Sequence, residues 1–136
     1  MVKHLREFDD YAKIKPAVNQ CEFHPHNTCP DLLNYCSERN IHFQAYSSLG
    51  SPRSRQALFK EPSVLEMCRK YDCQPAQLLL AWAINQNVSV LPKTVNLDHL
   101  KSNVKAANIS IQKSDIDLLK NLKTVKRYCW DPTAVA

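Results

Sequence analysis

Short apolar stretches alternate along the chain with longer amphipathic ones, and this alternation predicts a repeating order of strands and helices. Residues 17–23, 41–46 and 88–91 have the length and apolar pattern of strands. The longer stretches repeat their apolar positions every three to four residues, which is typical of helices. The predicted helices are 2–12, 28–39, 63–71, 76–86, 97–107 and 116–122, with a polar loop over 47–61.

Capping residues mark where several of these helices begin and end. Thr28, Ser63 and Ser114 each stand three residues before an acidic residue, so we predict them as N-caps. Asn40 suits the left-handed residue that ends a helix. The helix over 76–86 is apolar almost all round, and we therefore expect it to be buried. Leu97, Leu100 and Val104 form a packing stripe on the helix that follows it.

Strands that alternate with helices indicate parallel βαβ units with right-handed crossovers, and hence an α/β fold. Three parallel strands leave two open edges, so the pattern resembles part of an open doubly wound sheet or of an eight-stranded barrel. We expect self-association through these edges. We also expect incomplete packing of apolar strand residues, namely Val18, Phe43, Ala45, Val88 and Val90.

Composition places the chain among ordinary single-domain globular proteins, with 136 residues, 44% hydrophobic and 23% charged. Its longest apolar run, 78–84, is too short to cross a bilayer, and residues 1–15 lack a signal-peptide core, so we expect a cytoplasmic protein without membrane association. The net charge of +5 is interleaved with acids, which argues against nucleic-acid binding but suits a small anion. Six cysteines without a C-x-x-C pair predict free thiols.

The segment 45–52 leaves the second predicted strand and combines small hydroxyl residues with the chain's only glycine, Gly50. Such a turn exposes backbone N–H groups that suit a pyrophosphate, and Tyr46 offers an aromatic face for a flat ring. An ordinary Ser/Gly/Pro turn with a packing tyrosine would have the same sequence.

The segment 91–103 follows the third predicted strand. Lys93 and Thr94 precede a helix N-terminus, where unpaired N–H groups attract anions. His99, Ser102 and Asn103 share one helix face, although a solvated polar face has the same pattern. Ligands of parallel α/β sheets bind beyond the carboxyl ends of the strands, where both segments lie.

The segment 21–29 contains two cysteines and two histidines, which raises the possibility of zinc. The spacing fits no usual zinc finger, so metal binding is not favoured. Glu22 is an acid/base candidate without an evident partner, and a cysteine–histidine nucleophile lacks an orienting group.

At these segments the sequence resembles the aldo-keto reductase family. Residues 15–26 (KPAVNQCEFHPH) are similar to the family's K-P-x-x-N-Q-x-E-x-H-P-[YH] motif, and residues 45–50 (AYSSLG) to its A-Y-S-P-L-G loop. Residues 91–94 (LPKT) match its I-P-K-[ST] signature, and the helix over 74–82 resembles x-x-A-Q-V-x-L-R-W. The resemblance runs from about Val2 to Asp131.

The resemblance implies that residues 1–136 are a partial domain, the C-terminal three strands of a (β/α)8 TIM barrel, with NADP(H) across the strand ends. It places Gln20 on the carboxamide and Tyr46 against the nicotinamide ring. The pyrophosphate positions fall on Ser47, Leu49 and Ser51, and the 2′-phosphate positions on Lys93, Thr94, Val95 and Asn96. Asn103 falls on the adenine, and His99 stands where the family commonly has an arginine. With Ser102 replacing the usual acid, preference between NADPH and NADH stays open.

The family's catalytic Asp, Tyr, Lys and His lie on the first four strands, in motifs that this sequence does not contain. We therefore expect a fragment that carries cofactor-binding residues but no catalytic residue, from a parent that acts on a small-molecule carbonyl substrate. The alternatives are a non-catalytic nucleotide-binding or regulatory fragment and an incomplete gene model. Tyr128, Cys129 and Trp130 either line a substrate pocket or form a surface clip.

Overall fold

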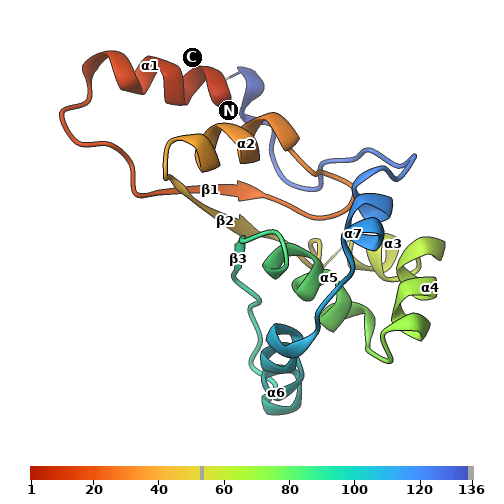
Figure 1. Ribbon diagram of the computed structural model, residues 1–136. Helices are drawn as coiled ribbons and strands as arrows, with labels where there is room; N and C mark the ends of the chain where they lie inside the picture. Colours follow the sequence, from red (N-terminus) through yellow and green to blue (C-terminus); the bar gives the residue numbers. More distant parts are fainter. Residues whose placement is uncertain (53, 135–136) are drawn as a thin grey trace.

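The computed structural model describes residues 1–52 and 54–134 and contains one three-stranded parallel sheet in the order β1-β2-β3 (Figure 1). The strands are β1 (Val18–Glu22), β2 (His42–Tyr46) and β3 (Ser89–Val90). Gln20 pairs with Gln44, and Gln44 in turn with Ser89. The strands are parallel, so their carboxyl ends lie at the same end of the sheet. The predicted parallel α/β arrangement is confirmed, with a third strand shorter than expected.

Helices flank and extend the sheet. Their bounds are α1 (Val2–Tyr11), α2 (Pro30–Glu38), α3 (Arg55–Phe59), α4 (Pro62–Lys70), α5 (Pro75–Ile84), α6 (Leu97–Lys105) and α7 (Lys113–Lys120), with 3-10 turns at Ala106–Asn108 and Pro132–Ala134. Figure 1 shows α2 beside β1, α1 beyond α2, and α6 at the opposite end of the molecule from α1. Among the described residues, no helix is long and apolar enough to span a membrane.

The predicted N-caps at Thr28, Ser63 and Ser114 are wrong. Helices α2 and α4 begin at Pro30 and Pro62, because proline has the φ of a first helical residue and no N–H to satisfy. Helix α7 begins at Lys113, one residue before Ser114. The predicted loop over 47–61 contains the short helix α3. The left-handed conformation predicted for Asn40 is confirmed by its φ of 56°.

The core forms where α5 packs against the strands. Residues 78–83 of this helix are buried, as its apolar sequence predicts. The Trp82 ring stacks on Phe23 with centroids 4.8 Å apart, and its indole N–H donates to the Ile116 carbonyl at 3.2 Å. Helices α5 and α7 are thereby joined to the end of β1. All six cysteines are free thiols, as predicted.

The two faces of the sheet differ in character. Phe43 and Ala45 are buried toward the helices, and Val88 is buried beside them, so the incomplete packing predicted for these three residues is wrong. The error is one of strand parity, since adjacent residues of a strand point to opposite faces. Val18 is 48% exposed, in agreement with the prediction. On its face, Gln20 donates to the Gln44 side-chain oxygen at 2.7 Å.

Helix α6 contributes no buried residue, and its predicted packing stripe is wrong. Leu97, Leu100 and Val104 are 62%, 50% and 67% exposed. The helix is instead anchored at its ends. Gln77 on α5 donates to the Ser102 carbonyl at 3.2 Å, and Ala106 is fully buried directly after α6. Periodicity identified an apolar stripe, but it does not specify whether another element covers it.

Candidate functional site

An amide and a phenol lie together at the carboxyl end of the sheet. The register pairs Gln20 with Gln44 and Glu22 with Tyr46, so these four side chains point to the same face. The hydrogen bond between Gln20 Nε2 and Gln44 Oε1 fixes the Gln20 amide. Tyr46 is half-buried, and this burial raises the pKa of its hydroxyl. The phenol is therefore protonated at neutral pH and presents its ring at the sheet edge.

The loop after β2 is compact and turns through two left-handed residues. Ser47 has a φ of 51° and Gly50 a φ of 73°, and the Gly50 N–H donates to the Ser47 carbonyl at 2.8 Å. The Ser51 hydroxyl is 2.8 Å from the Ser54 hydroxyl at the start of α3. Ser48 Oγ is buried and has no hydrogen-bond partner among the described residues. Leu49 packs against the core and anchors the loop.

The segment after β3 is an internally capped helix start. Asn96 Oδ1 accepts the N–H groups of Asp98 at 2.8 Å and His99 at 3.2 Å, and the Thr94 hydroxyl accepts the Asn96 N–H at 3.1 Å. The prediction that free N–H groups at this helix start attract an anion is wrong for these two donors, because Asn96 satisfies them. Exposed Lys93 and His99 side chains remain available.

The candidate residues fall into two groups. Gln20, Tyr46 and Ser47 lie around the carboxyl ends of β1 and β2. In the described part of the chain, the hydrogen bonds of residues 93–103 that involve a side chain run within that segment and to α5 through Gln77. Val95 is fully exposed, and Asn103 is half-buried. The first group is therefore held by the strands β1 and β2, and the second by its own hydrogen bonds and by α5.

A buried polar cluster closes the carboxyl end of β1, and we call Glu22, His24, His26, Glu61 and Tyr128 the Glu22 cluster. The Glu22 carboxylate is 2.8 Å from His24 Nε2. His26 lies 2.6 Å from the Tyr128 hydroxyl and 3.1 Å from the Glu61 carboxylate. The prediction that Glu22 lacks a partner is therefore wrong. Alternating polar residues at the end of β1 hint at the cluster, but its partners come from distant segments.

The same carboxylate holds the C-terminal tail, residues 126–129, against the strand. Glu22 accepts the backbone N–H of Tyr128 at 2.6 Å and of Cys129 at 3.2 Å. The Lys126 N–H donates to the His26 carbonyl at 2.7 Å. Burial alone would raise the pKa of Glu22, but the hydrogen bonds from His24 and the tail outweigh it and leave that pKa below its usual value. Glu22 is thus a carboxylate at neutral pH.

The tail also reaches the loop after β2. Cys129 Sγ lies 3.3 Å from Ser47 Oγ, and Tyr128 is half-buried against His24, with ring centroids 5.0 Å apart. Trp130 is 64% exposed. Of Tyr128, Cys129 and Trp130, which the sequence singles out, the first two therefore pack at the strand ends and Trp130 points to solvent.

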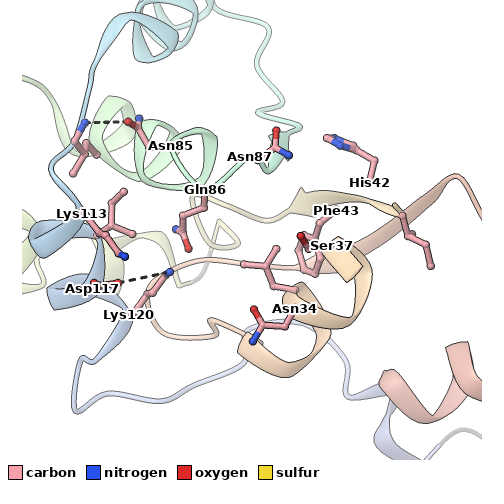
Figure 2. Close-up of a pocket in the computed structure, with 14 residues that line it drawn as sticks. Asn34, Ser37, His42, Phe43, Asn85, Gln86, Asn87, Lys113, Asp117 and Lys120 are labelled. Atoms are coloured by element: carbon pink, nitrogen blue, oxygen red, sulfur yellow. Dashed lines mark hydrogen bonds and ion pairs between the residues drawn. The ribbon is translucent and has the colours of Figure 1, made fainter. Parts of the chain in front are cut away.

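A groove of about 530 Å³ lies at the other end of β2, between α2, α5 and α7 (Figure 2). His42 and Phe43, at the start of the strand, contribute to its wall. Lys120 on α7 pairs with Asp117 at 3.8 Å, and Figure 2 shows this pair beside the groove. None of the candidate cofactor residues lines it.

A comparison with known families decides the assignment. The profile of the Aldo/keto reductase family matches residues 1–124, which is most of the chain. The chain belongs to the aldo/keto reductase family. Glycerol 2-dehydrogenase (NADP(+)) of Saccharomyces cerevisiae is 37% identical over 114 residues, which cover 84% of this chain and 35% of that protein. This aldo/keto reductase chain spans 35–41% of the length of such curated relatives.

Solved structures of other aldo/keto reductases contain the same arrangement. The enzyme MGS-M4 from a deep-sea metagenome library superposes with a TM-score of 0.90 at 25% identity, over 98% of this chain and 49% of that one. Aldose reductase from Giardia lamblia gives a TM-score of 0.86 at 26% identity, over 98% of this chain and 46% of that one. The three-stranded unit therefore matches part of the (β/α)8 barrel of aldo/keto reductases.

Proposed function

We propose that this chain supplies the NADP(H)-binding end of an aldo-keto reductase barrel and corresponds to its C-terminal strands. The proposal depends on one observation: Gln20, Tyr46 and the loop that begins at Ser47 lie together at the carboxyl ends of two neighbouring parallel strands. The yeast relative named above is an NADP(+)-dependent glycerol 2-dehydrogenase. By the same likeness, the whole protein would interconvert small carbonyl compounds and alcohols.

The residues at the strand ends fit a dinucleotide phosphate. Ser48 Oγ is buried and has no hydrogen-bond partner in the described chain. In the same loop, Gly50 has a left-handed conformation and lies close to the backbone of Arg55. A Cβ on Gly50 would lie 3.2 Å from Ser54 Oγ, so the tight turn suits glycine. On the other segment, Lys93 is an exposed cation next to a well-capped helix start.

Each group of residues would hold a different part of the cofactor. The Tyr46 ring would lie against the nicotinamide, and the fixed Gln20 amide would bind its carboxamide. Ser47, Leu49 and Ser51 would surround the pyrophosphate. Lys93, with Thr94, Val95, Asn96 and His99, would bind the 2′-phosphate, and Asn103 the adenine. When bound, NADP(H) supplies the hydride for carbonyl reduction.

We assign no catalytic residue in this chain. A proton donor for carbonyl reduction must lie beside both the cofactor and the substrate. Tyr46 and Lys93 already have binding roles, and Glu22 is engaged by His24 and two backbone N–H groups. We therefore infer that the isolated chain binds cofactor fragments without reducing carbonyl substrates.

Titration with adenosine 2′,5′-bisphosphate tests the binding assignment. Lys93→Met should weaken binding by about tenfold or more, since a hydrogen bond to a charged group contributes roughly 1.5–3 kcal/mol. Lys101→Met makes the same change at an exposed position of α6 without an assigned role, and should leave affinity unchanged. Tyr46→Ala should also have little effect, because this ligand lacks a nicotinamide. Equal affinity for adenosine with and without the 2′-phosphate would contradict the assignment.

An activity assay tests the inferred absence of catalysis. The purified chain should show no NADPH-dependent reduction of aldehydes, measured as loss of NADPH absorbance. Removal of a proton donor typically lowers the rate by a factor of roughly 10² to 10⁴. Turnover that Tyr46→Phe abolishes would show instead that the phenol is the proton donor and that the binding role assigned to it is incomplete.

A further inference from the structure

The groove at the amino end of β2 is not explained by the cofactor residues, none of which lines it (Figure 2). Helix α2, the turn after α5 and helix α7 form its walls, and β2 contributes Phe43. Its volume of about 530 Å³ lies within the range of small-molecule sites, roughly 300–1,000 Å³. The chemistry of its lining residues therefore indicates what it can hold.

Gln86 contributes a buried acceptor to this groove. Its Nε2 donates to the Trp82 carbonyl at 2.8 Å. Because a carbonyl oxygen can only accept, the amide nitrogen must face Trp82, and the amide oxygen must face away from it. That oxygen is buried and has no hydrogen-bond partner among the described residues. A buried acceptor without a donor is costly, so the groove favours a ligand that carries a hydroxyl or N–H group.

The charged residues of α7 leave the groove with one uncompensated positive charge. Lys113, Asp117 and Lys120 all line it. Lys120 lies 3.8 Å from the Asp117 carboxylate, so these two charges largely offset each other. Lys113 is exposed and forms no ion pair or hydrogen bond through its side chain among the described residues. A single cation matches the charge of a carboxylate, whereas a phosphate monoester carries nearly two negative charges at neutral pH.

Helix α2 supplies further polar groups that are not used within the fold. Asn34 and Ser37 lie three residues apart on one face of α2, and both line the groove. Their side chains make no hydrogen bond among the described residues. Asn85, in contrast, donates to the Ala81 and Ile109 carbonyls at 2.8 Å and accepts the Ile111 N–H at 3.1 Å. Asn85 therefore supports the fold, whereas Asn34 and Ser37 are available to a ligand with several hydroxyl groups.

We propose that this groove binds a small polyhydroxylated carboxylate, such as a sugar acid. Lys113 pairs with the carboxylate, Gln86 Oε1 accepts one hydroxyl, and Asn34 and Ser37 bond to others. A neutral polyol lacks the charge that Lys113 requires, and a fatty acid lacks the hydroxyl that Gln86 requires. The groove shares no residue with the cofactor site proposed above, so the two assignments stand or fall separately.

Titration of the full chain with D-gluconate tests the ligand class, with binding measured by saturation transfer from protein to ligand protons. Sorbitol has the same carbon chain without the carboxylate, and hexanoate has the carboxylate without the hydroxyls. We expect saturable binding of gluconate and affinities about tenfold lower, or less, for the two comparison ligands. Sorbitol or hexanoate binding as tightly as gluconate would overturn the proposal, as would the absence of saturable gluconate binding.

Variants of the lining residues test the position of the site. Lys113→Met should weaken gluconate binding about tenfold and Asn34→Ala about threefold, since the first removes a charged partner and the second a neutral one. Both residues are exposed, so both variants should fold, which circular dichroism checks. Lys123→Met changes an exposed lysine outside the groove and should leave gluconate affinity unchanged.

Two further measurements separate the groove from the buried amide and from the cofactor site. Gln86→Met should weaken gluconate binding, and if its lost bond to Trp82 unfolds the chain, the Lys113 and Asn34 variants decide the question. Lys93→Met should leave gluconate affinity unchanged, whatever it does to nucleotide binding. Gluconate binding that is insensitive to Lys113→Met and Asn34→Ala, or equally sensitive to Lys93→Met or Lys123→Met, would overturn the assignment to this groove.

Discussion

Glu22→Gln should release the C-terminal tail while preserving the shape of the buried side chain. Glu22 is 1% exposed and accepts the N–H groups of Tyr128 and Cys129 and a hydrogen bond from His24. A glutamine retains one acceptor oxygen but replaces the other with an NH2 group. One backbone N–H of the tail would then face a donor, and the charge that strengthens both bonds would be absent.

The size of the effect follows from the bonds that are lost. A hydrogen bond to a charged group contributes roughly 1.5–3 kcal/mol to stability, and at least one such bond between Glu22 and the tail disappears. The remaining bonds, from the Lys126 N–H to the His26 carbonyl and from Tyr128 to His26, are untouched. We therefore expect the population of the released tail to increase by about 10- to 150-fold, since each 1.4 kcal/mol corresponds to a factor of ten.

Limited trypsin digestion measures this population directly. Cleavage after Lys126 and Arg127 requires the tail backbone to leave β1, and its rate tracks the open population when closing is faster than cleavage. Cleavage after Lys13, an exposed residue outside the tail, is the internal reference and should not change. Glu7→Gln removes an exposed carboxylate from α1 and is the matched control.

An increase of less than about threefold in tail cleavage, relative to Lys13, would refute this reasoning. It would mean that the Glu22 carboxylate contributes little to holding the tail, as some buried charges do when desolvation offsets their hydrogen bonds. A matching increase at Lys13 would show instead that the whole chain is destabilised. Only a selective increase at Lys126 and Arg127 agrees with a local clamp.

Two further predictions concern pH and association. Burial lowers the pKa of His26 below its usual 6.5, despite Glu61, with His24 and Lys126 acting in the same direction as burial. The neutral ring therefore stabilises the fold above pH 6.5, and this stability is lost as pH falls through the folded-state pKa. Urea-unfolding midpoints measured at several pH values should show this loss, and His26→Asn should remove it. The open edges of β1 and β3 should make the chain self-associate at micromolar concentration, measured by sedimentation velocity, and a monodisperse monomer would contradict this.

Local sequence patterns were sufficient for the strands and for the buried helix α5. Alternation and short apolar runs identified β1 and β2, and an almost uniformly apolar stretch identified α5. Helix starts were less predictable, because a proline and a capping hydroxyl lie close together in the sequence at both α2 and α4. The helices begin at Pro30 and Pro62, and not after Thr28 and Ser63. A proline at the first helical position fixes the backbone whether or not a capping hydroxyl is near.

The candidate site was predictable only where it depends on neighbouring residues in the sequence. The loop after β2 and the segment after β3 each follow a strand directly, so their positions at the sheet edge follow from the topology. The Glu22 cluster depends on Glu61 and on Tyr128, which lies 106 residues from Glu22. Likewise, only the structure shows that Asn96 occupies the N–H groups at the start of α6.

The hydrogen bond between Gln20 and Gln44 has a consequence for how the molecule meets water. On the same open face, His42 Nε2 lies 2.9 Å from Ser89 Oγ, so polar pairs bridge β1 to β2 and β2 to β3. A face of this kind is wetted, whereas an apolar face of similar size attracts other molecules without regard to alignment. Around this sheet, contacts between copies are then left to the unpaired backbone of the outer strands, which is directional. Aggregates that form through this sheet should consequently grow by ordered strand addition, with edge-to-edge periodicity, and hydrophobic dye should bind at the exposed apolar stripe of α6 rather than at the sheet.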